Sequence, residues 1–495
     1  MVSAKLLIVP LIPVATGLLV LAARRKPNLR ETSSVAGAAL TFLTVLSLLP
    51  HVLAGGTWTC DLITLYPGIA VKFRLDALGM LFAGTASFLW IAAALYSIGY
   101  LRGLKEHAQT RFYCCYAVSV GAGLGVALSG SLFTLYLCYE LISIFTYPLV
   151  MHHQDDKGYY GGRKYLIYLM FTSKAFLLPA LALTYVLCGT LDFSAGDLML
   201  GIFPPGADPT LVTVTFLLFL FGFAKAGIMP LHTWLPDAMV APTPVSALLH
   251  AVVVVKAGIF ALCRVMLSLF GVQLLDQTGL GLFTAYFVSF TIIVASVIAL
   301  TRTDLKARLA YSTVSQLSYI VLGVALLTPR AITGGLLHIT NHAFAKITLF
   351  FCAGAIAVAS GKNDIREFGG LGYRMPLTMT AFGLASLSLI GIPPVSGFVS
   401  KWFLSLGAMD SRNLIILAVL MTSSLLNAGY FVPIVLTAFF GTPPVGEPVA
   451  VGSLERAPLI ALMVVPLFIC GLISVLLGIF PDLLLALAGL MGGGK

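Results

Sequence analysis

Long apolar runs recur from one end of this 495-residue chain to the other, and they restrict its fold more than any other feature. Most of the runs approach or exceed the roughly 20 residues that an α-helix needs to cross about 30 Å of hydrocarbon. Hydrophobic residues make up 59% of the chain and charged residues only 10%, far from the balance of a soluble domain. The chain is therefore predicted to be an all-α integral membrane protein.

The runs are separated by short breaks, and the longest gaps lie around residues 55–73 and 189–210. Two runs flank Pro393 and Pro394 and are counted as one broken helix, which predicts about fourteen transmembrane helices. The predicted helical runs cover residues 5–23, 34–54, 75–98, 112–130, 131–151, 164–188, 211–229, 242–268, 279–300, 305–327, 331–359, 375–391, 395–409, 412–440 and 457–480.

Positive charges set the expected topology. The first run is followed by Arg24, Arg25, Lys26 and Arg30, whereas a signal peptide has its charges before the apolar core, so this run is predicted to be a retained helix. Placing these charges in the cytoplasm puts 17 Lys and Arg residues in cytoplasmic loops and 7 outside. We expect a multi-pass protein of the cell inner (cytoplasmic) membrane with both termini on the non-cytoplasmic side. The net charge of +10 is then mostly a topology signal, and no nucleic-acid partner is expected.

The eight cysteines are scattered, and no C-x-x-C pair occurs among them. Their spacing encodes neither an iron–sulfur cluster nor a zinc site. We therefore expect no cofactor, no metal and no electron-transfer centre in this chain.

Ionisable residues within the apolar runs carry the functional signal. A buried lysine costs about 2.5–3.5 kcal/mol on insertion scales, and the runs contain several. A single such lysine is equally well explained by an ion pair between helices, but the whole set favours an ion pathway. The lysines are Lys174, Lys225, Lys256, Lys346 and Lys401.

Two further patterns accompany the lysines. In HITNHAFAKITLFF, the residues His338, His342 and Lys346 are each four apart and share one helical face, which is expected to line a hydrated interior. Haem ligation by the two histidines is disfavoured, because two residues one turn apart cannot be the two axial ligands of one haem. Glu140 lies on a polar stripe of an otherwise apolar helix, and His250 lies in the run that also contains Lys256.

Prolines near two of the lysines predict broken helices. Pro230 follows Lys225, and the pair Pro393 and Pro394 precedes Lys401. Irregular backbone at membrane depth is tolerated only where protein or water covers it, and paired breaks indicate inverted repeats. The predicted division is 1–111 (helices 1–3), 112–268 (helices 4–8, the first inverted repeat), 279–440 (helices 9–13, the second inverted repeat) and 441–495 (helix 14).

These residues predict a proton relay. Burial disfavours the charged form of a lysine and a nearby carboxylate favours it, so a change at Glu140 would load or release a proton at Lys225. The other histidines and lysines would be stepping stones. Moving a charge against 100 mV costs about 2.3 kcal/mol, and the chain shows no energy source of its own.

Several segments carry a resemblance to a known family. FAKAGIMPLHTWLPDAMVAPTPVSALLH with VVKAGIF, TRTDLKARLAYSTVSQLSY, HITNHAFAKITLFFCAGAI and GIPPVSGFVSKW resemble the antiporter-like subunits shared by respiratory complex I, the multisubunit Mrp cation/proton antiporters and the membrane-bound group 4 nickel–iron hydrogenases. The resemblance spans about residues 75–440. It implies proton or sodium translocation driven by partner membrane subunits, with a peripheral redox arm in some members.

The resemblance also implies roles for single residues. Glu140 and Lys225 would be the coupled pair, and Lys401 the exit-side residue. A small polar residue is expected at Lys174, so the lysine is a departure from the family pattern. The implied residues between entry and exit are His250, Lys256, His338, His342 and Lys346.

The subfamily is a finer question. Lysine at Lys401 resembles the Mrp and hydrogenase members and one complex I member, whereas another complex I member typically has a glutamate there. The chain also ends soon after its last run, without the long lateral helix of the largest complex I member. An Mrp or hydrogenase-type subunit is favoured, with a subunit of a quinone-reducing complex I as the alternative. Two other classes stay open: a stand-alone solute carrier, for which no anion clamp of paired intramembrane arginines is present, and a passive membrane anchor of a redox enzyme.

Overall fold

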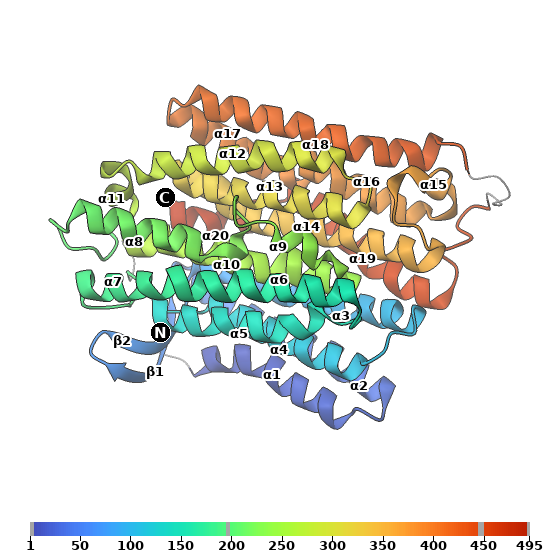
Figure 1. Ribbon diagram of the computed structural model, residues 1–495, viewed down its shortest axis with the longest axis horizontal. Coiled ribbons are helices and arrows are strands. Elements are labelled where there is room, and N and C mark those ends of the chain that lie inside the picture. Colours follow the sequence, from blue (N-terminus) through green and yellow to red (C-terminus); the bar gives the residue numbers. More distant parts are fainter. Residues whose placement is uncertain (1–3, 195–198, 444–449, 493–495) are drawn as a thin grey trace.

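The computed structural model describes residues 4–194, 199–443 and 450–492, and nearly all of its regular structure is helical. The helices run side by side along the longest axis of the molecule (Figure 1). Ten helical segments among the described residues are long and apolar enough to cross a membrane. The prediction of a multi-pass helical membrane protein is confirmed.

In the described part of the first half, the α-helices are accompanied by a β-hairpin, a π-helical turn (η1) and two 3-10 turns (η2 and η3). Its elements are α1 (Lys5–Ala22), α2 (Pro27–Leu53), β1 (Trp58–Tyr66), β2 (Ile69–Leu75), α3 (Ala77–Gly103), α4 (Gln109–Ala127), α5 (Leu132–Val150), α6 (Asp156–Thr172), η1 (Ser173–Leu177), α7 (Leu178–Cys188), α8 (Pro209–Gly222), η2 (Ala224–Ala226), α9 (Trp234–Asp237) and η3 (Ala238–Val240).

The second half combines long continuous helices with π-helical segments and short turns. Its elements are η4 (Val245–Val253), α10 (Val254–Val265), η5 (Met266–Phe270), α11 (Val272–Gln277), α12 (Leu280–Thr301), α13 (Leu305–Ala325), α14 (Pro329–Ser360), η6 (Ile365–Glu367), α15 (Leu371–Arg374), α16 (Pro376–Ile390), α17 (Ser396–Asp410), α18 (Leu414–Phe440), α19 (Pro458–Ile479) and α20 (Asp482–Gly492).

Most predicted runs coincide with helices, but several short elements lie outside them, and two of these are the hairpin and the last helix. The gap at residues 55–73 contains most of an antiparallel hairpin of β1 and β2, in which Trp58 pairs with Leu75 and Tyr66 with Ile69. A short helix, α20, follows the last predicted run after a break at Pro481. Both lie at the end of the bundle where α1 begins, and the chain therefore starts and finishes at the same end (Figure 1).

Two segments break where prolines remove backbone donors. Helix α8 stops at Gly222, and an irregular stretch with Pro230 separates it from α9. Helix α16 ends at Ile390, and α17 begins after Pro393 and Pro394. The prediction of 211–229 as one continuous run is therefore wrong, because its helix ends seven residues earlier, at Gly222.

One continuous segment lies at the centre of the bundle. All residues of η4, α10 and η5 are buried, although most of their side chains are apolar and would suit lipid equally well. Helix α14 lies beside this segment and is buried over most of its length. Outer helices such as α2, α12 and α18 expose leucines and phenylalanines instead, as expected for a surface in contact with lipid.

Glycine brings the central segment into backbone contact with the first break. A Cβ atom on Gly258 of α10 would lie 2.4 Å from the Ala226 nitrogen and 2.6 Å from the Lys225 carbonyl carbon. Both are main-chain atoms, which move only with the segment that holds them. The absence of a side chain at Gly258 therefore fixes the position of Lys225.

We expect Gly258→Ala to lower the midpoint of thermal unfolding of the purified chain in detergent. The clash with η2 should cost about 1–3 kcal/mol, which outweighs the helix propensity that alanine gains. Gly84→Ala in α3 is the matched control, because its added Cβ meets no atom within 4 Å. An equal midpoint for the two variants would contradict this role of Gly258.

Candidate functional site

The carboxylate of Glu140 is paired with Lys174. Glu140 lies on α5, and its Oε2 is 2.5 Å from Nζ of Lys174 in the π-helical turn η1. Lys174 Nζ also donates to the Tyr136 hydroxyl at 2.8 Å. The Lys174 side chain is 49% exposed on the outside of the bundle, whereas that of Glu140 is 11% exposed. The ion pair therefore connects the interior with the surface.

Lys225 is fully buried in the first break and contacts Tyr139 instead of a carboxylate. Its Nζ donates to the Tyr139 carbonyl at 2.6 Å and lies 3.2 Å from the centre of the Tyr139 ring. The Lys225 backbone N–H also donates to the Tyr139 hydroxyl at 3.2 Å. Tyr139 precedes Glu140 in the chain, so a movement of the carboxylate's helix also changes the surroundings of Lys225.

Lys256 joins the central segment to α14. Its Nζ donates to the Ala251 carbonyl at 2.6 Å and lies 2.9 Å from Nδ1 of His342. Ala251 belongs to the π-helical η4, where the wider turn alters the usual backbone pairing and such turns often mark functional sites. An amine and an imidazole at this distance can exchange a proton directly.

His338 lies one turn before His342 on α14 and contacts two further helices. Its Nε2 is 3.0 Å from Oε1 of Gln316 on α13, and its Nδ1 is 2.8 Å from Oγ of Ser400 on α17. The His338 ring stacks on Tyr319 with centroids 5.6 Å apart. The Tyr319 ring also contacts Lys401, whose Nζ lies 5.1 Å from the ring centre.

The remaining buried ammonium groups also use backbone carbonyls as acceptors. Lys401 Nζ donates to the carbonyls of Leu389 and Ile390, at 2.7 and 3.0 Å, and to the Ser424 hydroxyl. These carbonyls lie at the C-terminal end of α16 and have no acceptor role within the helix, because the helix breaks there. Lys346 Nζ donates to the Leu309 carbonyl of α13 at 3.1 Å. No carboxylate is within 4 Å of Lys225, Lys256, Lys346 or Lys401 in the described residues.

Several buried polar atoms near these lysines and histidines have no hydrogen-bond partner among the described residues. They include both ring nitrogens of His250, Nε2 of His342 and the hydroxyl of Tyr319. The His250 ring lies 6.0 Å from that of Tyr165 and 6.1 Å from that of Trp234. Buried polar groups of this kind normally bond to ordered water.

The structure thus brings together part of the predicted set. Lys256 contacts His342, whose ring lies 5.8 Å from that of His338, and the Tyr319 ring contacts both His338 and Lys401. His338, His342 and Lys346 are fully buried. The coupled pair expected at Glu140 and Lys225 is not an ion pair here, because the carboxylate contacts Lys174. Spacing within a helix gave no sign of that contact, since α5 and η1 meet only in the folded bundle.

Comparison with known proteins places the chain in a family. Residues 129–427 match the family described as NADH:quinone oxidoreductase/Mrp antiporter, transmembrane. The chain belongs to this family. The resemblance drawn from its sequence segments is confirmed, and the chain is an antiporter-like membrane protein.

Two relatives illustrate the breadth of the family. The NADH-quinone oxidoreductase subunit N of Desulforudis audaxviator is 33% identical over 463 residues, which cover 90% of each chain. The Na+/H+ antiporter subunit A1 of Staphylococcus haemolyticus is 32% identical, and the match covers 90% of this chain but only 56% of that subunit. The chain thus spans just over half of this longer relative.

Two solved structures share the fold. A chain of the Mrp complex from a Dietzia species and a chain of the membrane-bound sulfane sulfur reductase, an archaeal respiratory membrane complex, each superpose with a TM-score of 0.85 at 24% identity. Each match covers 99% of this chain, and 96% and 97% of the other chain. At this identity the comparison supports the fold alone.

Double-mutant cycles should show which lysine is the direct partner of Glu140. Using Glu140→Gln with Lys174→Gln, we expect a coupling energy of about 0.5–3 kcal/mol in the free energy of unfolding. Using Glu140→Gln with Lys225→Gln, the coupling should be below about 0.5 kcal/mol, because these side chains do not touch. A larger coupling for Lys225 than for Lys174 would contradict the contacts described here.

Proposed function

We propose that this chain is the ion-translocating, antiporter-like subunit of a multisubunit membrane complex and moves protons, or sodium ions against protons, through its buried polar line. Glu140 would respond to a neighbouring subunit and Lys225 would load the proton. His250, Lys256, His342 and His338 would carry it inwards, with Lys346 beside them. Lys401 would be the exit-side residue.

The contact between Lys256 and His342 carries the proposal. An amine and an imidazole lie 2.9 Å apart in the fully buried centre, and the next histidine contacts hydroxyl and amide groups of two more helices. A bundle that needed only packing would place small or apolar residues there. Ionisable residues at membrane depth are typical of proton relays.

The finer architecture belongs to the same proposal. The chain would have fourteen transmembrane helices, with inverted repeats at residues 112–268 and 279–440 between the segments 1–111 and 441–495. The two proline breaks, one beside Lys225 and one beside Lys401, support this division. The excess of Lys and Arg at one end supports a location in the cytoplasmic membrane with both termini outside the cytoplasm.

Partner subunits would supply the energy. The half-exposed Lys174 lies where a neighbouring subunit can contact it, and the chain would act with other membrane subunits. An Mrp antiporter or a group 4 hydrogenase-type complex is the first candidate, because Lys401 resembles the lysine of those members. The full-length similarity to subunit N favours a quinone-reducing complex as the second. Subunits that co-purify with the chain would separate the two, since a nickel–iron partner, a quinone-site partner and further antiporter subunits are each diagnostic.

We expect both Lys225→Ala and Lys225→Arg to abolish coupled ion movement in vesicles that contain the assembled complex. Alanine cannot hold a proton, and arginine keeps its proton at any reachable pH. Pumping and subunit retention would be measured together for both variants. Lys157→Arg, at the exposed start of α6, is the control and should pump normally.

A purely structural role makes the opposite forecast. If Lys225 only balanced a buried charge, arginine would largely rescue pumping. Alanine would leave Glu140 paired with Lys174, so the arginine variant is the one that separates the two roles. Near-normal pumping by Lys225→Arg would therefore rule out proton loading at this residue.

The chain alone should insert into liposomes but drive no uphill transport. Its described residues offer a buried path for protons, and the energy for uphill transport must come from partner subunits. The measurement is ion uptake against a gradient by the reconstituted single chain, with the whole complex as the positive control. Robust uphill transport by the single chain would contradict the subunit role.

A further inference from the structure

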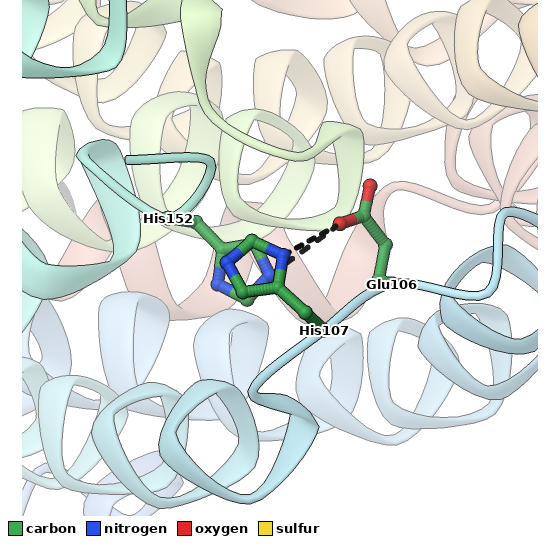
Figure 2. A group of neighbouring side chains, drawn as sticks. All are labelled: Glu106, His107 and His152. Carbon is green, nitrogen blue, oxygen red and sulfur yellow. Dashed lines mark ion pairs between the residues drawn. The ribbon is translucent and has the colours of Figure 1, made fainter. Parts of the chain in front are cut away.

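A compact group of metal-ligating side chains lies outside the relay, at the end of the bundle opposite the β-hairpin. Glu106 and His107 belong to the segment that joins α3 to α4, and His152 follows the end of α5. Figure 2 shows both imidazole rings beside the Glu106 carboxylate. One ligand atom from each of the three residues lies within 4.8 Å of the other two.

The distances exceed hydrogen-bond length but suit a shared ion. Glu106 Oε2 is 3.6 Å from Nε2 of His152 and 3.9 Å from Nδ1 of His107. Hydrogen bonds between nitrogen and oxygen are about 2.7–3.2 Å long. Ligands at about 2.0–2.2 Å from a tetrahedral zinc ion are roughly 3.3–3.6 Å apart. Small side-chain movements would bring all three atoms to one ion.

His152 provides the second observation. Its side chain is 0% exposed, and neither ring nitrogen has a hydrogen-bond partner among the described residues. A buried imidazole normally satisfies at least one nitrogen. Arg111 donates to the His152 carbonyl at 3.0 Å and holds this residue in place. The His152 ring also packs against the His107 ring, with the two centroids 4.8 Å apart. The His152 ring thus lies with its Nε2 3.6 Å from the Glu106 carboxylate, and neither of its nitrogens has a hydrogen bond among the described residues.

Backbone strain is concentrated around the same residues. Lys105, Ala108 and Gln154 have φ values of 51°, 46° and 56°, and they are three of the five non-glycine residues with positive φ in the described chain. Such conformations cost energy and persist at sites that the surrounding structure holds in place. Lys105 and Ala108 lie on either side of Glu106 and His107, and Gln154 lies two residues after His152.

We propose that Glu106, His107 and His152 bind a divalent first-row transition metal of the zinc type. Two imidazoles and one carboxylate are ligands that zinc accepts, and three protein ligands leave a position for water. The ion would join the segment between α3 and α4 to the end of α5, the helix that carries Glu140. The site is distinct from the relay, because none of its ligands contacts the buried lysines.

Zinc binding to the purified full chain tests the proposal. After removal of bound metal with a chelator, Zn2+ would be titrated in competition with a chromophoric chelator. We expect one saturable site that weakens as imidazole protonation competes at lower pH. X-ray absorption at the zinc edge should report two imidazole nitrogens at about 2.0–2.1 Å.

Variants locate the site. His107→Ala and Glu106→Gln should each weaken zinc binding by at least about tenfold. His51→Ala, at the other end of the bundle, and Glu367→Gln, on an exposed turn, are matched controls that should bind zinc as the parent chain does. His107 is 49% exposed, so its removal tests the site without disturbing the core. Zinc should raise the thermal midpoint of the parent chain and of the controls only.

Two results would overturn the site. One is equal zinc affinity in the parent chain, His107→Ala and Glu106→Gln, which would place the ion elsewhere. The other is the absence of saturable binding in the parent chain, which would leave the three residues as a simple group of ion pairs. Neither result would bear on the relay, because transport is not measured in this experiment.

Discussion

Satisfying four ammonium groups without carboxylates is the constraint on which the interior of this protein depends. Lipid supplies no hydrogen-bond acceptor, so each buried lysine must find one inside the protein. The acceptors for Lys225, Lys256, Lys346 and Lys401 include main-chain carbonyls in every case. For Lys256 and Lys401 these carbonyls lie where a helix widens or ends, which links the irregular backbone directly to the two lysines.

The same constraint explains the order of the helices around the centre. The segment of η4, α10 and η5 is covered by other helices on all sides, and α14 supplies His342 as the polar neighbour of Lys256. Helices α13 and α17 in turn contact His338 of α14. Close approach requires small residues at the contacts, as at Gly258 beside Lys225 and at Gly407 beside Ala331. The buried lysines, the helix breaks and the close glycine contacts therefore occur together around the centre of the bundle.

Much of the fold could be predicted from the sequence, because apolar length and proline position depend on local chemistry. Helices α1, α12 and α14 begin and end within two residues of the predicted runs. The hairpin was missed because its strands mix polar and apolar residues and carry little apolar signal. Helix α20 is apolar but only 11 residues long, which is too short for a predicted membrane span. Contacts between helices were also hidden, and the pairing of Glu140 with Lys174 is the main example. The group at Glu106 escaped notice because His152 lies far along the chain from His107, although adjacent histidines in a polar loop were a usable signal.

The π-helical turn η1 gives the Glu140 ion pair a particular property. A π-turn contains more residues than the α-helical turns around it, and it can move along the helix by shifting its hydrogen bonds, so that the extra residue passes to a neighbouring turn. Such a shift turns the affected side chains by about 100° per residue around the helix axis. Lys174 lies within η1, and its ammonium group would swing away from the carboxylate while α6 and α7 kept their places. The ion pair is thus attached to a segment that can alter its register without unfolding.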